Sequence, residues 1–328
     1  MNKPEQAAGR PPLPAGIAVL GPTGSGKSAL AMQIAAHLPA EIISVDSAQV
    51  YRGLDIGTAK PTAEERRAVP HHLIDIIGPE QVYSAGQFRT DALRLVDEIT
   101  ARGRVPLLVG GTMLYFRALF RGIAELPVAD VNLRGQLDAD AARQGWPALH
   151  ARLAALDPEA ARRIHPNDAQ RIQRALEIAA LSGQPRDQLW MQDHSYNDFS
   201  HWRICVLEPG NRAQLHELLR QRLEQMVQAG LAEEVRQLLA RGTLEENAPV
   251  LRLVGYRQFV SHVRGQESLE AAVARALAAT RQLAKRQLTW LRGDNLLPSG
   301  ASVLRSDPFA SGTKELLRAL LIEARKPA

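Results

Sequence analysis

A chain of 328 residues is long enough for one large domain or two modest ones, so a mini-protein and a pure tail are both excluded. Hydrophobic residues make up 45% and charged residues 23%, which is ordinary globular usage, and no apolar run approaches the roughly 20 residues of a membrane helix. The net charge of +5 is too small by itself to require a nucleic-acid partner.

The start of the chain and its cysteine content predict a cytoplasmic location. Residues 1–15 are rich in Pro and Ala, and we expect a disordered leader without the apolar core of a secretory signal. Cys205 is the single cysteine of the sequence, which excludes a disulfide framework. We therefore expect a cytoplasmic monomer that does not associate with membranes.

Short apolar runs alternate with helical stretches along most of the chain. The predicted strands are residues 17–20, 42–45, 73–77, 105–109 and 204–207. This alternation indicates an α/β fold in which helices flank a parallel sheet. Only helix signals occur between the last two runs, so residues 125–198 are predicted to be an all-helical insertion domain. The core domain is then 16–124 together with 199–328.

Capping residues and glycines predict the limits of several helices. Pro147 suits the first turn of one helix in the insertion. The other predicted helices begin at a cap and end at or near a glycine, over 167–183, 211–230 and 268–293, with Asn167, Asn211 and Ser268 as the caps. A last helix is predicted over 314–321.

A phosphate-binding loop directly follows the first predicted strand. It matches the P-loop pattern G-x-x-x-x-G-K-[ST] in full, as Gly21-Pro22-Thr23-Gly24-Ser25-Gly26-Lys27-Ser28. The glycines let backbone N–H groups wrap a phosphate, Lys27 supplies positive charge, and Ser28 can ligate Mg²⁺. The alternative is a merely glycine-rich turn, which the strand-loop-helix context disfavours. The sequence thus predicts a P-loop NTPase-like core, of the kind that binds ATP, with a di- or triphosphate ligand and Mg²⁺.

Acidic residues distinguish this chain from motor and switch NTPases. Such proteins hold Mg²⁺ with an aspartate at a strand end, but the fourth predicted strand here ends in Gly110-Gly111-Thr112. Asp46 instead follows the second strand, on the rim that a parallel sheet shares with the P-loop, where a carboxylate can act as a general base. The alternative is that Asp46 caps the next turn through the N–H of Ser47 or Ala48.

Longer motifs follow in order along the chain: DSAQVYRGLDIGTAKP (46–61), HHLIDI (71–76), YSAGQF (83–88), VGGTMLYFRAL (109–119), NDAQRIQRALE (167–177) and VGYRQF (254–259). With the P-loop, they make residues 17–292 closely resemble the bacterial tRNA dimethylallyltransferases, also called tRNA isopentenyltransferases. The first string is highly specific, because no generic P-loop enzyme needs it.

The resemblance implies transfer of a dimethylallyl group from dimethylallyl diphosphate to the N6 amine of the adenosine on the 3′ side of the tRNA anticodon, with release of diphosphate. It implies Asp46 as the general base, Thr23 near the bridging oxygen, and Lys27 and Arg222 as cationic contacts. The P-loop and Mg²⁺ on Ser28 would then stabilise a leaving group. Leu218 stands where the family often has an arginine, so the number of cationic contacts is left open.

The expected partner is the tRNA anticodon stem-loop, from which the target base must be extruded. By resemblance, the tRNA contacts are Asp46, Ser47, Ala48, Gln49, Thr112, Arg134, Gln170, Arg171, Ile172, Gln173, Arg174, Arg252, Leu253, Val254, Gly255, Tyr256, Arg257, Lys285, Arg286, Gln287, Leu288, Thr289, Trp290, Leu291 and Arg292. For Gly255-Tyr256, a packed turn is the alternative.

The residues themselves favour part of this assignment. In the segment 170–174, Ile172 can face a core while its polar neighbours form a surface rich in hydrogen-bond donors. Residues 252–292 carry eight Lys and Arg against two Glu, a balance of +6 (8 − 2). Arg281, Lys285 and Arg292 share one helical face. A merely solvated arginine-rich face is the alternative for both segments.

Two other function classes stay open. In a P-loop small-molecule kinase, Asp46 would take the acceptor hydroxyl proton, but a small acceptor needs no basic helical insertion. A non-catalytic, GTPase-like RNA-binding module is disfavoured by the missing acid after the fourth strand. His71-His72 lack the partner spacing of a metal site, and Tyr115 and Phe116 are expected in the core rather than as a base-stacking platform.

Overall fold

The computed structural model describes residues 13–123, 127, 130–183, 198–245, 248–293, 295–310 and 312–323. The chain divides into two compact units, one comprising residues 1–121 and 198–328 and the other residues 122–197. From the sequence, the insertion was expected at 125–198. The leader expected over residues 1–15 lies largely outside the described residues.

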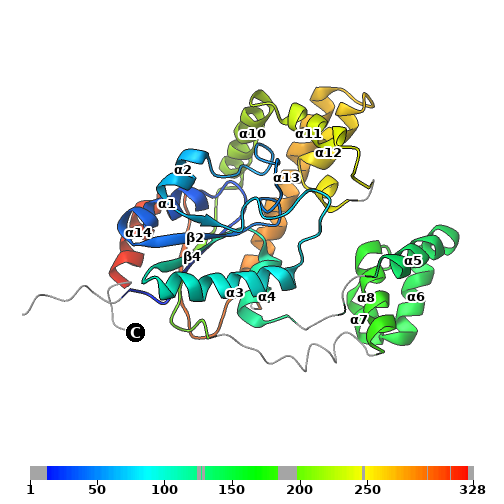
Figure 1. Ribbon diagram of the computed structural model, residues 1–328, viewed down its shortest axis with the longest axis horizontal. Helices are drawn as coiled ribbons and strands as arrows, with labels where there is room; N and C mark the ends of the chain where they lie inside the picture. The colour runs from blue at the N-terminus through cyan, green and yellow to red at the C-terminus, as the bar shows by residue number, and fades with distance from the viewer. Residues whose placement is uncertain are drawn as a thin grey trace, which may run out of the picture. The chain divides into compact units, whose positions relative to one another are not determined.

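The larger unit is built on a parallel sheet, which has six strands in the described part of the chain (Figure 1). Its strand order is β3-β2-β4-β1-β5-β6. The strands are β1 (Ile17–Leu20), β2 (Ala40–Val45), β3 (His71–His72), β4 (Val105–Gly110), β5 (Arg203–Leu207) and β6 (Ser302–Ser306). Every pair of neighbouring strands is parallel. The α/β fold predicted from the alternation of elements is therefore confirmed.

Helices flank this sheet, and the elements described in the smaller unit are also helices. In the larger unit they are α1 (Lys27–His37), α2 (Ala63–Ala68), α3 (Ala85–Ala101), α4 (Met113–Arg121), α10 (Arg212–Gln228), α11 (Leu231–Ala240), the 3₁₀ helix η1 (Pro249–Arg252), α12 (Tyr256–Val263), α13 (Leu269–Arg292) and α14 (Gly312–Glu323). In the smaller unit they are α5 (Val131–Gln144), α6 (Trp146–Leu156), α7 (Pro158–Arg163) and α8 (Ala169–Ser182).

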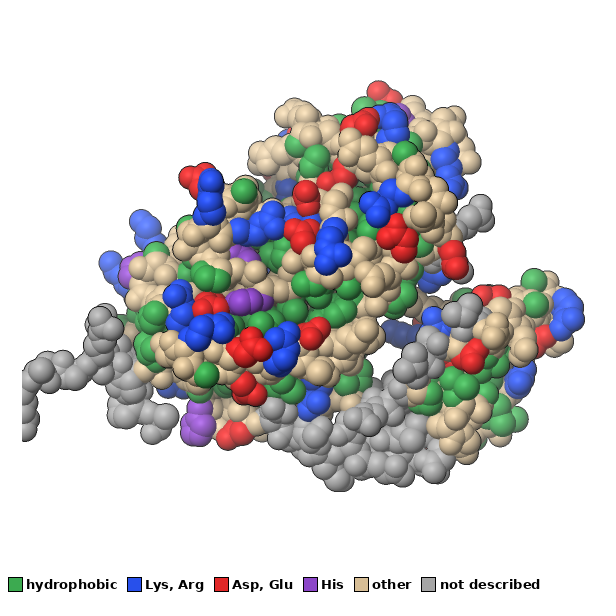
Figure 2. Space-filling model, in the orientation of Figure 1, with side chains coloured by type: hydrophobic (Ala, Val, Ile, Leu, Met, Phe, Trp, Pro, Cys, Tyr) green, Lys and Arg blue, Asp and Glu red, His purple; other side chains and the backbone are tan. Residues whose placement is uncertain are grey.

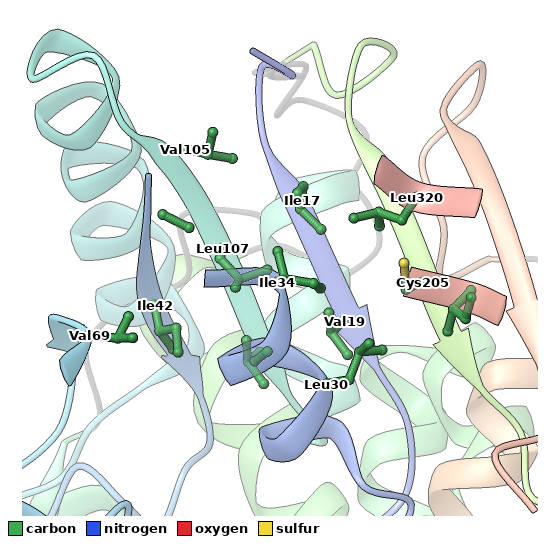
Figure 3. Close-up of a cluster of buried hydrophobic side chains, with 14 of the residues drawn as sticks. Ile17, Val19, Leu30, Ile34, Ile42, Val69, Val105, Leu107, Cys205 and Leu320 are labelled. Carbon is green, nitrogen blue, oxygen red and sulfur yellow. The ribbon is translucent and has the colours of Figure 1, made fainter. Parts of the chain in front are cut away.

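One face of the sheet is covered by α1 and α14. Ile17 and Val19 of β1 alternate toward this face, where Leu30 and Ile34 of α1 pack on them, and Leu320 of α14 packs nearby (Figure 3). All five side chains are fully buried, and each such burial contributes about 1.5–3 kcal/mol. All four residues of β1 are apolar and buried, as expected for a central strand of a parallel sheet that is covered on both faces.

Three strands end together at the carboxyl edge of the sheet. Gly110 at the end of β4 pairs with Leu20 at the end of β1 and with Val45 at the end of β2. The P-loop, Asp46 and the segment Gly111-Thr112 all leave from these ends. The common rim that the sequence predicted for the P-loop and Asp46 is therefore present.

The predicted strand over 73–77 is wrong. Only His71 and His72 pair with β2, and the chain then turns, with φ of 60° at Leu73 and 56° at Asp75. The carboxylate of Asp75 accepts hydrogen bonds from Lys60 at 2.6 Å and from Arg66 at 2.8 Å. These ion pairs hold the apolar run as a loop, which an alternation of apolar residues cannot reveal.

Two other predictions of helix limits need correction, and one strand was not predicted. The cap of α8 is Asp168, whose side chain accepts from the N–H of Arg171, and not Asn167. The helix capped by Asn211 ends at Gln228 and not at Gly230, because Gly230 is the N-cap of the next helix, α11. The strand β6 was not predicted, since its residues Ser302–Ser306 are short and polar at both ends. Ser268 as a cap and Pro147 in the first turn of α6 are confirmed.

Candidate active site

A cavity of about 620 Å³ lies at the carboxyl edge of the sheet in the larger unit. Segments far apart in the sequence line it, including the P-loop, residues 46–49, residues 57–61, residues 110–112, α10, the η1–α12 junction and α13. Of the residues assigned a chemical role from the sequence, Thr23, Lys27, Ser28, Asp46 and Arg222 all line this cavity. Tertiary folding thus brings together groups that the sequence separates by up to about two hundred positions.

The P-loop has the backbone geometry that wraps a phosphate. Gly24 and Gly26 adopt φ of 80° and 83°, a left-handed conformation that side chains with a Cβ rarely adopt, and Gly26 caps α1. The ammonium of Lys27 donates to the carbonyl of Pro22 at 2.6 Å. The loop and the start of α1 together present backbone N–H groups and positive potential to an anion.

Two cations in the cavity have little anionic compensation. Burial and the nearby Arg222 lower the pKa of Lys27 to about 7, against a smaller opposite effect of Asp46. Burial also lowers the pKa of Arg222. In the described residues, Arg222 makes no hydrogen bond or ion pair. A site with two such cations and one nearby carboxylate is suited to a ligand with several negative charges.

Asp46 uses one carboxylate oxygen for the backbone and leaves the other available. Its Oδ1 accepts from the N–H of Ala48 at 2.8 Å and more weakly from that of Gln49 at 3.4 Å. The turn-capping alternative is therefore present. No hydrogen-bond donor reaches Oδ2 from the described residues. Capping fixes the carboxylate in place, so the two interpretations of Asp46 are compatible.

The neighbouring wall of the cavity is also fixed by hydrogen bonds. The N–H of Ser47 donates to Thr112 Oγ1 at 3.1 Å, which ties the turn after β2 to the end of β4. The side-chain amide of Gln49 accepts from Ser44 Oγ at 2.8 Å and donates to the carbonyl of Ala59 at 3.2 Å. These polar atoms are used within the protein, so Gln49 supports the wall.

A buried lysine organises the loop between β2 and α2. The side chain of Lys60 is 1% exposed, and its ammonium contacts Asp55 and Asp75 at 2.6 Å each and the carbonyl of Tyr51 at 2.8 Å. Lys60 belongs to the longest motif, residues 46–61, but no role was predicted for it. The sequence feature that could have indicated a buried lysine is its position in a stretch of otherwise small residues, GTAKP.

Glu234 was missed entirely by the sequence analysis. Its carboxylate, in α11, accepts from the backbone N–H groups of Asp55, Ile56 and Gly57 at 2.6, 2.8 and 3.0 Å and from the hydroxyl of Tyr256 at 2.5 Å. Burial and this bond raise the pKa of Tyr256. Glu234 thus joins the two cavity walls that carry Gly57 and Tyr256. Its position beside Glu233 in an exposed-looking helix start gave no sequence signal.

The predicted RNA-contacting residues of the larger unit separate into three groups. The first group lines the cavity and comprises Arg252, Leu253, Val254, Gly255, Tyr256 and Gln287, together with Asp46 to Gln49 and Thr112. Arg257, Lys285, Arg286, Thr289, Trp290 and Arg292 are exposed. Leu288 and Leu291 of α13 are buried, and Leu288 packs with Leu215 and Leu219 of α10, so their RNA contacts stay a prediction that the burial of their side chains does not favour.

The basic stripe of α13 lies on a different face from the cavity. Thr280, Leu283 and Gln287 line the cavity at i, i+3 and i+7, whereas Arg281 and Lys285 face away from that stripe at 3.6 residues per turn. Arg281 is half-buried. Hydrogen bonds from Arg220 and Gln221 lower the pKa of Glu217 on α10, and the positive charge of Arg281 adds a smaller effect in the same direction. Arg281 is therefore partly engaged within the protein.

In the smaller unit, two predicted RNA contacts surround a buried carboxylate. Glu177 is fully buried and binds Arg134 at 3.0 Å and Arg174 at 2.5 Å, besides the N–H of Asp130. Burial alone would raise the pKa of Glu177, but these partners hold it below its usual value. Ile172 is also fully buried on the apolar face of α8, which confirms the expectation that it faces a core, and its RNA contact stays a prediction. Gln170 and Arg171 are exposed.

The prediction that Tyr115 and Phe116 lie in the core is confirmed. Tyr115 and Phe116 are buried, and Tyr115 stacks on Phe88 with ring centroids 4.4 Å apart. Among the described residues no group of three His, Cys, Asp or Glu could hold a metal ion, and His72 instead contacts Glu41 at 2.7 Å.

Neither the surface charge of the larger unit nor the hydropathy of the helices adds a further candidate site. Lys and Arg side chains are interspersed with Asp and Glu on the face of the larger unit drawn in Figure 2. No helix in the described part of the chain has the length and apolarity needed to cross a bilayer.

The sequence is similar to a well-defined protein family. Residues 49–294 match the family model described as IPP transferase. The tRNA dimethylallyltransferase of Aromatoleum aromaticum is 55% identical over 279 residues, which are 85% of this chain and 87% of that protein. The tRNA dimethylallyltransferase of Bordetella petrii is 56% identical over 278 residues, 84% of this chain and 88% of that protein.

Solved structures show the same architecture. The full-length tRNA isopentenylpyrophosphate transferase of Bacillus halodurans is 36% identical, with a TM-score of 0.63 over 94% of this chain and 96% of that one. A eukaryotic dimethylallyltransferase described as acting on tRNA is 25% identical, with a TM-score of 0.78 over 95% of this chain and 80% of that one.

Proposed function

Because the chain belongs to the IPP transferase family, we propose that it transfers a dimethylallyl group from dimethylallyl diphosphate to the N6 amine of the adenosine on the 3′ side of a tRNA anticodon. The observation that carries this proposal is the cavity in which Lys27 and Arg222 face a ligand space bounded by Asp46. A cytoplasmic monomer that binds the tRNA anticodon stem-loop is part of the proposal.

The proposed reaction forms one bond and breaks one. The N6 lone pair attacks C1 of the dimethylallyl group, the C1–O bond breaks, and diphosphate leaves with the bonding electrons. The N6 proton passes to Asp46 Oδ2, the oxygen that the backbone does not use. The adenine amine is a weak nucleophile because its lone pair is delocalised into the ring, so orientation and proton removal both lower the barrier.

The leaving diphosphate gains negative charge as the C1–O bond breaks. Lys27, Arg222 and the N–H groups of the P-loop would neutralise this charge, and the hydroxyl of Thr23 would donate to the bridging oxygen. These groups favour the transition state over the ground state, because the charge on the departing oxygen is larger there.

Ser28 fits the role of a protein ligand for a Mg²⁺ ion that the substrate phosphates would also hold. Its side chain lines the cavity and has no hydrogen bond from the described residues. Mg²⁺ is commonly held by few protein oxygens plus phosphates and water, which suits a site with one hydroxyl and one nearby carboxylate. When bound there, Mg²⁺ would add positive charge at the departing diphosphate.

Incubation with labelled substrates tests the proposed function. The protein is mixed with dimethylallyl diphosphate labelled in the allyl group, or with ATP labelled at the γ-phosphate, with and without tRNA. We expect allyl label in tRNA and no transfer from ATP. Transfer of phosphate to a small acceptor would instead support the kinase alternative, and no transfer of either label would support a binding module.

Diphosphate binding should be coupled to protonation of Lys27. Its pKa of about 7 in the free protein leaves part of the amine neutral at neutral pH. A bound diphosphate raises this pKa, so binding takes up a proton, and we expect the Kd to rise with pH above about 7, by up to tenfold per pH unit. Titration calorimetry between about pH 7 and about pH 9 measures this dependence.

The matched comparison is Lys27→Arg, whose guanidinium stays charged throughout this pH range. Any slope that remains in Lys27→Arg reports ionisation of the ligand itself. Equal slopes for the two proteins would contradict the assignment of the titration to Lys27.

The exposed cations of α13 should contribute to RNA affinity through ion release. Lys285 and Arg286 are both exposed, unlike Arg281. Replacing both by alanine should reduce the slope of log K against log salt concentration by about 1.4 to 1.8, because each phosphate contact contributes roughly 0.7 to 0.9. The control replaces Lys314 and Arg318 by alanine. Both are exposed residues of α14, a helix that packs near α1 (Figure 1). Equal slopes in both double variants would remove this part of α13 from the RNA interface.

A further inference from the structure

One glutamine joins the P-loop to the end of β4. The side chain of Gln287, on α13, accepts from the backbone N–H of Thr23 at 2.9 Å through Oε1. Its Nε2 donates to the carbonyl of Gly111 at 2.8 Å. Both ends of the amide are therefore used by backbone groups that lie 264 and 176 positions away in the sequence.

The surrounding backbone is shaped to admit this side chain. A Cβ on Gly111 would lie 2.6 Å from Nε2 of Gln287, closer than non-bonded atoms approach. Gln287 shares its cavity-facing stripe with Thr280 and Leu283, at i, i+3 and i+7 of α13. The bridge is thus set by α13 on one side and by the glycine after β4 on the other.

We propose that Gln287 is a positioning residue for the diphosphate-binding loop, and not the RNA contact expected from the sequence. The proposal rests on the proposed function, because it assumes that the P-loop holds the leaving diphosphate. Gln287 itself touches no reacting atom. It fixes the peptide before Thr23, and so the direction in which the Thr23 hydroxyl and the following N–H groups point.

The energetic reason is the cost of an unsatisfied backbone donor. Without Gln287, the N–H of Thr23 and the carbonyl of Gly111 lose their partners at a part-buried site, and the loop gains freedom that must be removed when substrate binds. Misplacement of the loop also weakens the charge stabilisation in the transition state. Both effects act on the diphosphate, while the RNA surface is unchanged.

The test compares Gln287→Ala and Gln287→Met with Gln282→Ala. Methionine keeps the volume of glutamine and removes both hydrogen bonds, so it separates their loss from a cavity left by alanine. Gln282 is exposed on the same helix and makes no hydrogen bond from the described residues. Steady-state kinetics give the KM for dimethylallyl diphosphate and kcat, and filter binding gives the Kd for tRNA.

We expect both Gln287 variants to raise the KM for dimethylallyl diphosphate about tenfold and to lower kcat about threefold to tenfold, with the Kd for tRNA within twofold of the parent protein. Gln282→Ala should match the parent in all three quantities. A weakened tRNA Kd with an unchanged KM for dimethylallyl diphosphate would overturn the proposal and restore the RNA contact.

The failure of this inference is distinguishable from failure of the proposed function. If the parent protein transfers no allyl label to tRNA, the proposed function fails and kinetics of the variants are not needed. If the parent is active and Gln287→Met behaves like the parent, only the positioning role fails. Circular dichroism of each variant shows whether it folds. If Gln287→Ala does not fold, Gln287→Met still tests the positioning role.

Discussion

Asp46→Asn is expected to lower kcat by about 10²- to 10⁴-fold, the usual contribution of a positioned general base. Asparagine keeps an oxygen that accepts from the N–H of Ala48, so the turn after β2 is preserved, but its amide cannot take the N6 proton. We expect the Kd for dimethylallyl diphosphate to change little. Single-turnover transfer of labelled dimethylallyl to tRNA measures the chemical step, and titration calorimetry measures the diphosphate affinity.

Asp198→Asn is the matched control for this variant. Asp198 is exposed and accepts from the N–H of Ser200 at 2.8 Å, the same i to i+2 contact that Asp46 makes with Ala48. It does not line the cavity. We expect parent turnover from this control. Near-normal turnover in Asp46→Asn would leave Asp46 with a capping role only and would require another base.

Glu234→Ala should destabilise the larger unit by about 3–5 kcal/mol, the usual cost of breaking a buried charged network. Its removal strips hydrogen-bond acceptors from three backbone N–H groups, of Asp55, Ile56 and Gly57, and from the hydroxyl of Tyr256. Alanine supplies no replacement acceptor, and a backbone N–H group without a partner at a buried site is costly. Urea denaturation followed by circular dichroism measures the free energy of unfolding.

The adjacent residue provides the comparison. Glu233 is exposed and contacts Arg236 and Gln237 of its own helix, so Glu233→Ala should cost about 0–1 kcal/mol. Tyr256→Phe, which removes one of the four contacts to Glu234, should fall between these values. Equal losses for Glu233→Ala and Glu234→Ala would show that the contacts of Glu234 contribute no net stability.

The P-loop and the strands β1 and β4 were predictable, because each is determined by residues that are adjacent in the sequence. The octapeptide from Gly21 to Ser28 specifies its loop because glycine conformations, a lysine and a helix start are all encoded within eight adjacent positions. The apolar runs of β1 and β4 were placed for the same reason, since their alternation or full burial is a property of consecutive residues.

The prediction over 73–77 was wrong because distant charges decide that segment. Leu73 and Ile77 are apolar and fit a strand, but Lys60 and Arg66 hold Asp75 in a turn. Ion pairs between segments have no period in the sequence, so they do not appear in any hydropathy pattern.

The candidate site was partly predictable in the same sense. Asp46 and Lys27 were assigned to one rim because the carboxyl ends of parallel strands lie along one edge. Arg222 came only from resemblance, since an arginine on an amphipathic helix is most often a solvated residue. The structure brings all three to one cavity.

Arginine side chains show most clearly what sequence patterns omit. Arg134 and Arg174 were expected to face RNA, yet both bind the buried carboxylate of Glu177. Whether an arginine meets solvent, a ligand or an internal carboxylate depends on which helix packs against it.

By itself, the sequence determined the sheet, the phosphate-binding loop and the family, because each of these is written in neighbouring residues or in an ordered series of motifs. Only the tertiary structure decided which polar side chains are consumed inside the protein. Glu234 and Gln287 bond to backbone groups more than 170 positions away, and such partners are chosen by the packing of helices on the sheet. Only the donors and acceptors that this packing leaves without a partner are available to bind substrate.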